Sequence, residues 1–102
     1  MDLKSFSEEM ARKFLDNDRQ MGDLFLFSCL AEEVGEAAKA LRKKDYNNLE
    51  EELADIIFIT VSLANFHGLN LEKVLLEKYL KPTAEDISKR WNDVSWKKTS
   101  GK

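Results

Sequence analysis

Two acidic motifs lie between Leu24 and Gly68: Leu30-Ala31-Glu32-Glu33-Val34-Gly35-Glu36 and Glu51-Glu52-Leu53-Ala54-Asp55-Ile56-Ile57-Phe58. Each motif holds a pair of acids three residues apart, a spacing that places both side chains on one side of a helix. The second pair leads directly into the most apolar run of the chain. This setting needs a physical reason, because clustered carboxylates repel one another and lose hydration where they are buried.

Helical periodicity extends to both sides of the motifs. Apolar residues at i, i+3, i+4 and i+7 spacing predict one helix over residues 23–44 and another over about 48–65. The link between them is so short that the helices are predicted to pack as an antiparallel hairpin. Over residues 56–63 the second helix is apolar almost all round, and a partner subunit is the simplest cover for it.

The predicted inner face of the first hairpin helix is the apolar stripe of Leu30, Val34 and Leu41. At about 100° per residue, Glu33 and Glu36 lie together on the flank of this stripe. The acid pair of the second helix shares its own stripe with the apolar residues that follow it. The two pairs are therefore predicted to face each other across the hairpin.

Spacing alone leaves two interpretations of the acids open. In the first, the acids are solvated helix faces paired with nearby lysines, an interpretation favoured for Glu32, Glu50 and Glu51 taken singly. In the second, the two pairs converge and bind a divalent cation, because hard cations such as Mg²⁺ prefer carboxylate oxygens. Asp55 favours the second interpretation, since Asp is a poor helix former and here directly precedes Ile56.

The flanking segments are also predicted to be helical. Ser5-x-x-Glu8 has the form of a capping box and predicts a first helix from about residue 6, followed by a polar break over residues 16–22. Asn70 is predicted to cap a further helix that ends before Pro82, and Thr83 to cap a last helix to about residue 92. The predicted fold is all-α, an antiparallel helical hairpin with flanking helices that forms a four-helix bundle through oligomerisation.

Length and composition limit the class of protein. The 102 residues fit one domain, with a motif core over residues 24–79 and a flexible tail from about 95 to 102. Hydrophobic residues make up 43% and charged residues 34%, with a single Pro, which suits a helix-rich globule. The net charge is −3 with scattered basic residues, so no nucleic-acid partner is expected. No apolar run approaches a membrane span and no signal peptide begins the chain, so a cytoplasmic protein without a membrane partner is expected.

The double acidic motif resembles that of the all-α nucleoside triphosphate pyrophosphohydrolases of the MazG-like superfamily. The likeness extends over about residues 24–79 and includes the apolar frame around both motifs. It implies a Mg²⁺ ion, with Mn²⁺ as the alternative, and an outer-shell or second-metal role for Glu32. The likeness also implies that Glu33 or Glu36 orients or deprotonates the attacking water. The implied metal ligands are Glu33, Glu36, Glu52 and Asp55.

The same resemblance implies the reaction and the assembly. Such enzymes hydrolyse a nucleoside triphosphate, often a deoxy one, to a monophosphate and pyrophosphate, and they form dimers or dimers of dimers. Lys78 matches a basic residue that binds the phosphates, although it can equally be an ordinary surface lysine. Some relatives carry a Tyr and an Asn where this chain has Ile59 and Pro82, so its phosphate and sugar contacts must differ. Basic residues that can compensate are Lys81, Lys89 and Arg90.

The sequence therefore predicts a Mg²⁺-dependent nucleotide pyrophosphohydrolase that acts as a homo-oligomer, a dimer or a tetramer. Two alternatives remain open at this point. The chain can be a non-catalytic helical oligomerisation or regulatory module whose acids are solvated. It can also be a pyrophosphohydrolase of another phosphorylated metabolite, such as a phosphoribosyl nucleotide.

Overall fold

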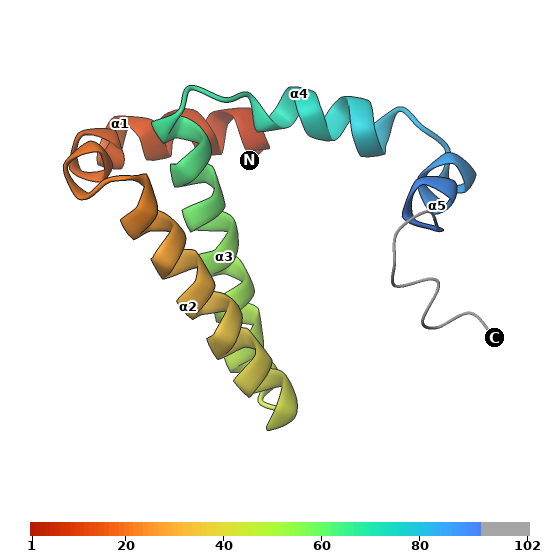
Figure 1. Cartoon of the computed structure of the whole chain (residues 1–102), viewed down its shortest axis with the longest axis horizontal. Helices are drawn as coiled ribbons and strands as arrows, with labels where there is room; N and C mark the ends of the chain where they lie inside the picture. Colours follow the sequence, from red (N-terminus) through yellow and green to blue (C-terminus); the bar gives the residue numbers. More distant parts are fainter. Residues whose placement is uncertain (93–102) are drawn as a thin grey trace. The chain divides into compact units, whose positions relative to one another are not determined.

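A computed structural model describes residues 1–92, and all of the secondary structure in this part is helical (Figure 1). No strand occurs within residues 1–92, which confirms the all-α prediction. The flexible tail predicted from about residue 95 lies outside the described residues. The described residues form two compact units, Met1–Asn70 and residues 71–92. The helical elements are α1 (Leu3–Met21), α2 (Asp23–Arg42), α3 (Tyr46–Phe66), α4 (Leu71–Leu75), the π-helix η1 (Leu76–Leu80) and α5 (Ala84–Asn92).

The helices α2 and α3 form the predicted antiparallel hairpin and pack along their length (Figure 1). The turn between them is tight: the Asp45 amide donates to the carbonyl of Ala40 at 2.9 Å, and Lys44 takes a left-handed φ of 58°. The cap of α3 is the side chain of Asp45, which accepts from the Asn48 amide at 3.2 Å. At the other end of the hairpin His67 lies 3.1 Å from the Asp23 carboxylate, which ties the end of α3 to the start of α2.

The first helix is longer than predicted at both ends. It begins at Leu3, because the side chain of Asp2 accepts from the Ser5 amide at 2.7 Å and so takes the capping role expected of Ser5. It continues through the predicted polar break, where Asp18 is buried and hydrogen-bonded to Ser62 of α3. The helix ends at Gly22, whose φ of 93° is available to glycine at little steric cost.

The helix α3 also packs against α1. The rings of Phe14 and Phe58 meet edge to face with centroids 5.4 Å apart. The side-chain amide of Asn65 donates to the carbonyl of Ser7 at 3.0 Å, which adds a polar contact between the same two helices. Val61 is the most completely buried large side chain of the described residues, with 1% of its surface exposed.

The core of Met1–Asn70 is thin and small residues dominate it. The buried hydrophobic residues are Leu26, Ala37, Ala40, Val61 and Ala64. Small side chains at these positions let the backbones of α2 and α3 approach closely. Many larger apolar side chains remain exposed, so one copy of the chain leaves much of its apolar surface uncovered.

The predicted inner stripe of α2 is wrong for the single chain. Val34 is 51% exposed and Leu41 is 57% exposed, whereas Leu26 and Ala40 are buried. The exposed set and the buried set both follow helical spacing, so spacing does not tell them apart. The face of α2 that packs on α3 is rotated about the helix axis from the predicted face. Phe27, at 59% exposed, extends the exposed set to three residues seven apart.

The second unit consists of α4, η1 and α5 as far as it is described. The carbonyl of Thr83 accepts from the Ile87 amide at 3.1 Å, and the hydroxyl of Thr83 accepts from the Asp86 amide, also at 3.1 Å. Thr83 therefore caps α5 as predicted. The helix before Pro82 is not regular to its end, because the Lys81 amide donates five residues back to Leu76 at 2.9 Å.

No single helix among residues 1–92 is long and apolar enough to cross a membrane. Among these residues only α3 and the segment Leu71–Leu80 taken together meet that test of length and composition.

Candidate metal and active site

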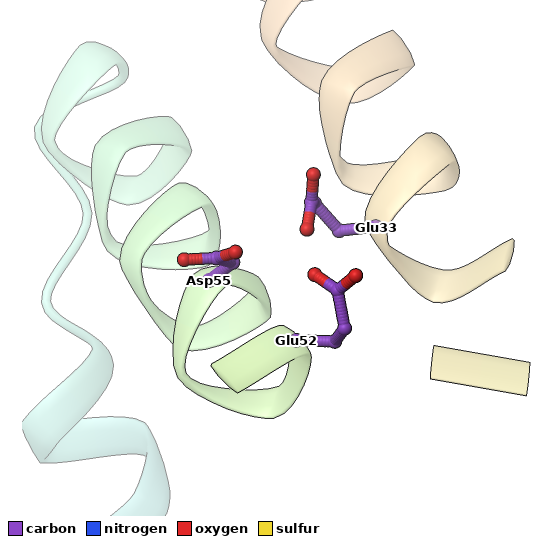
Figure 2. Close-up of side chains that lie close together, drawn as sticks. All are labelled: Glu33, Glu52 and Asp55. Carbon is purple, nitrogen blue, oxygen red and sulfur yellow. The ribbon is translucent and has the colours of Figure 1, made fainter. Parts of the chain in front are cut away.

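Glu33 lies on the side of α2 that packs against α3. At about 100° per residue it falls on the same face as Leu26, Ala37 and Ala40, the residues that α3 buries. Its carboxylate is therefore directed across the hairpin toward α3 (Figure 2). One oxygen of this carboxylate, Oε2, is buried and has no hydrogen-bond partner among the described residues. A buried acceptor left without a partner costs free energy, so this atom indicates that the site is incomplete as it stands.

The helix α3 presents two further carboxylates to Glu33. Glu52 and Asp55 stand three residues apart and project from the same side of the helix (Figure 2). One carboxylate oxygen from each of the three residues lies within 4.8 Å of the others. Glu33 and Glu52 are half-buried in the hairpin, whereas Asp55 is exposed, so the cluster opens to solvent on the side of Asp55.

Crowding changes the acidity of the cluster. The Glu52 carboxylate approaches Glu33 closely enough to form a hydrogen bond that favours the protonated form, and partial burial adds to this effect. The negative charges of Glu52 and Asp55 act in the same direction. Together they raise the pKa of Glu33 from 4.5 to about 7. At neutral pH Glu33 is therefore about half protonated, and a bound cation is the alternative way to offset the repulsion within the cluster.

The donor set fits a hard divalent cation. All three ligand groups are carboxylates, they converge from two helices, and one of them has an orphaned oxygen. Oxygen ligands of this kind suit Mg²⁺ or Mn²⁺, whereas zinc and copper sites favour nitrogen and sulfur. The open side leaves room for water or for a ligand oxygen in the remaining coordination positions, as Mg²⁺ requires.

Two of the predicted acids lie outside this cluster. Glu36, one turn after Glu33, is exposed and does not belong to the group whose oxygens lie within 4.8 Å. Glu32 is also exposed. Glu32 projects from α2 away from the face that Glu33 shares with the buried alanines, whereas Glu36 lies at the edge of that face. Lys78 belongs to the second unit, where its Nζ lies 5.8 Å from the ring centroid of Tyr79.

Sequence reasoning missed one buried carboxyl group. Asp18 stands in the stretch interpreted as a polar break, yet it is buried between α1 and α3. Burial raises its pKa, and the hydrogen bond from Ser62 partly offsets that effect. A partial signal was present, because Ser62 lies on the same stripe of α3 as Asp55 in an otherwise apolar segment.

These features define an all-α helical hairpin with a carboxylate cluster built across it. The family model of the MazG nucleotide pyrophosphohydrolase domain matches residues 21–83, more than half of the chain. The chain therefore belongs to the MazG nucleotide pyrophosphohydrolase family, as the double motif indicated. A search of curated proteins gave no match.

Proposed function

We propose that the chain is a Mg²⁺-dependent pyrophosphohydrolase that converts a nucleoside or deoxynucleoside triphosphate to a monophosphate and pyrophosphate. Family membership supports the general reaction class. The observation that carries the proposal is the approach of Glu33, Glu52 and Asp55 to within 4.8 Å across the hairpin, with one Glu33 oxygen buried and unpartnered. A solvated acidic face would not direct its carboxylates toward each other between two helices.

The proposed metal ligands are Glu33, Glu52 and Asp55, and Glu36 is the proposed fourth. A long, exposed Glu side chain can change rotamer, so Glu36 can join a cation held by the other three. Bound Mg²⁺ would supply neutralisation of phosphate charge and activation of a water molecule. Mn²⁺ is the proposed substitute, since it has the same preference for oxygen ligands. Glu32 remains a proposed outer-shell residue.

The proposed catalytic carboxylates are Glu33 and Glu36. A general base must lie within reach of the water that it deprotonates, and Glu33 belongs to the cluster that would hold the metal and its water. Glu36 is exposed beside the cluster, where a water molecule can reach it. Lys78 is the proposed contact to the phosphates, as a cation in the segment that follows the hairpin.

Turnover of a nucleotide panel tests the proposed function. Pyrophosphate release is measured with Mg²⁺, with Mn²⁺ and with EDTA, using common and noncanonical triphosphates and phosphoribosyl nucleotides. Glu52→Gln and Asp55→Asn are expected to lose at least about 100-fold in rate while remaining folded. Glu51→Gln is the matched control, because Glu51 is the exposed neighbour of Glu52 and lies outside the cluster.

Three outcomes of the panel separate the candidate functions. Release from a triphosphate supports the proposal, provided that it requires the metal and is lost only in the cluster variants. Release confined to phosphoribosyl nucleotides would assign the other substrate class. A folded chain that turns over no compound with either metal would contradict catalysis and favour a binding or regulatory module.

We further propose that the chain acts as a homo-oligomer whose subunits complete a four-helix bundle. The support is an exposed apolar seam on α2, formed by Phe27, Val34 and Leu41 at intervals of seven residues. Leu53 and Ile57 are similarly exposed on α3. Large apolar side chains at such spacing are typical of a helix that packs against another helix.

A shallow hollow beside α3 adds to the uncovered apolar surface. Its volume is about 360 Å³, and it lies between the start of α1 and α3. The residues that line it are Met1, Asp2, Leu3, Phe6, Ala54 and Ile57. Ile57 is one of the exposed apolar residues of α3 and also lines the hollow. A subunit that packs over these apolar residues would therefore also cover the hollow.

Sedimentation velocity tests the oligomer. The wild-type chain is expected to sediment as a dimer or tetramer at micromolar concentration. Val34→Glu is expected to shift it toward the monomer, because the substitution places a charge in the proposed interface. Ser28→Glu, also at an exposed position of α2 but outside the apolar seam, is the matched control. A wild-type chain that remains monomeric would contradict this proposal.

A further inference from the structure

The segment η1 contains a carbonyl group that the chain beyond it cannot pair in the ordinary helical way. The carbonyl of Lys78 would accept from the amide four residues later, but that residue is Pro82, which has no N–H. The next amide, that of Thr83, is directed to the carboxylate of Asp86 at 3.4 Å. The guanidinium of Arg90 on α5 donates to the Lys78 carbonyl oxygen instead, at 2.9 Å. Arg90 is thus positioned by a carbonyl that Pro82 leaves unpaired.

The ring of Tyr79 lies close to Arg90 and also to a second cation, Lys78. The guanidinium carbon of Arg90 lies 5.4 Å from the centroid of the Tyr79 ring, and Nζ of Lys78 lies 5.8 Å from the same centroid. An aromatic ring attracts cations through the negative charge of its faces. Arg90 is therefore fixed both by the ring and by the carbonyl, and Lys78 is drawn to the same ring. Both cationic side chains are exposed to solvent.

Neither cation is paired with a carboxylate in the described part of the chain. The nearby acid Glu77 accepts from Lys81 at 2.9 Å, and Asp86 is engaged at the start of α5. A guanidinium carries five N–H groups, and the carbonyl contact of Arg90 uses only part of this capacity. Because both cations lie within 5.8 Å of the centroid of one ring, an anion beside Tyr79 would be attracted by both. Planar Arg donors together with a Lys ammonium are well suited to phosphate oxygens.

We propose that Arg90, together with Lys78 on the Tyr79 ring, binds a phosphate chain, either inorganic pyrophosphate or the polyphosphate of a nucleotide. The choice of phosphate among anions rests on the proposed function, whereas the placement of the two cations does not. Arg90 lies beyond residues 21–83, which the family model matches. Of the other basic residues considered, Lys81 is engaged in an ion pair, and Lys89 contacts neither the ring nor the carbonyl in the described structure.

Calorimetric titration of the full chain with inorganic pyrophosphate tests this site. EDTA is present throughout, so that the carboxylate cluster carries no metal. Arg90→Gln is expected to weaken binding about tenfold, because a charge-assisted hydrogen bond is lost while an amide can still reach the Lys78 carbonyl. Tyr79→Leu is expected to weaken it about threefold through loss of the ring. Lys89→Gln, which removes the same charge one residue away, is the matched control and should change affinity by less than about twofold.

The result of the titration decides the inference. The absence of pyrophosphate binding by the wild type, equal losses in Arg90→Gln and Lys89→Gln, or wild-type affinity in Arg90→Gln would each overturn it. Circular dichroism checks that helix content is retained. If Arg90→Gln is unfolded, Arg90→Lys replaces it, with an expected loss of about threefold because the charge remains while the planar fork is lost; wild-type affinity in that variant would again overturn the site.

Two further comparisons separate the sources of phosphate and the two proposals. If a nonhydrolysable triphosphate competes with pyrophosphate, and Arg90→Gln weakens the binding of both equally, the site binds the phosphates of the substrate. If the triphosphate does not compete, the site binds free pyrophosphate. Normal pyrophosphate binding in Arg90→Gln beside loss of turnover in Glu52→Gln would refute this inference alone. Weakened binding in Arg90→Gln beside a chain that hydrolyses no triphosphate would refute the proposed function alone.

Discussion

Replacement of Glu33 by Gln is expected to stabilise the metal-free protein at alkaline pH. Crowding by Glu52, partial burial and the negative charges of Glu52 and Asp55 raise the pKa of Glu33 from 4.5 to about 7. The folded chain therefore binds this proton more tightly than the unfolded chain does. The stabilisation that results from proton binding at Glu33 is fully present below pH 4.5 and is lost as the pH rises through 7.

The size of the effect follows from the same pKa. At about 1.4 kcal/mol for each pKa unit, the change from 4.5 to about 7 corresponds to about 3 kcal/mol. Because the cluster is open to solvent beside Asp55, screening reduces this figure, and we expect about 1–2 kcal/mol. The neutral amide of Gln removes the repulsion at all pH values, so Glu33→Gln should gain this amount at pH 8 and little at pH 4.

Urea unfolding followed by helical circular dichroism measures the difference. Wild type, Glu33→Gln and the control Glu51→Gln are compared in EDTA at one protein concentration, since association would also affect stability. The wild type should in addition gain about 2.7 kcal/mol at a Mg²⁺ concentration 100 times its Kd, a gain that Glu33→Gln should lose. A Glu33→Gln variant less stable than wild type at pH 8 in EDTA would refute the reasoning, because the carboxylates would then not be repelling one another.

Three further substitutions test the fold around the site. Asp18→Asn should raise the thermal midpoint at pH 8 more than at pH 4, because burial raises the pKa of this carboxyl and the charged form is disfavoured; an unchanged or lower midpoint at pH 8 would contradict this. Val61→Ala should cost about 2 kcal/mol in urea unfolding, since Val61 is 1% exposed, and a loss below about 0.5 kcal/mol would show that the packing of α1 on α3 is loose. Lys44→Gly should gain about 0.5–1 kcal/mol, because Lys44 holds a left-handed φ of 58° in the hairpin turn, and a destabilised variant would argue against that turn geometry.

Much of the architecture could be predicted from local sequence signals. Apolar periodicity gave the hairpin helices, and the short link gave their antiparallel packing. The first helix was harder, because its polar end depends on a tertiary contact of Asp18 with Ser62 that no local pattern reveals. The irregular end of the helix before Pro82 was also missed, since the missing N–H acts through a carbonyl four residues earlier.

The site was predictable in part for a similar reason. Spacing placed Glu52 and Asp55 on one side of their helix, and these two do meet Glu33 in the structure. The orientation of α2 was not predictable, because apolar periodicity does not distinguish residues buried within one chain from exposed apolar residues such as Val34. The predicted stripe of α2 was therefore rotated. The spacing of three residues placed Glu36 with Glu33, but it could not show that the side chain of Glu36 stays exposed.

The central claim is that carboxylates from α2 and α3 hold one divalent cation between them. Anomalous diffraction from crystals soaked in Mn²⁺ tests this claim most directly, because Mn²⁺ replaces Mg²⁺ on oxygen ligands and its position can be identified. We expect a peak in contact with Glu33, Glu52 and Asp55 at once. A peak bound elsewhere, or none in a soaked crystal whose three carboxylates are accessible, would contradict the account.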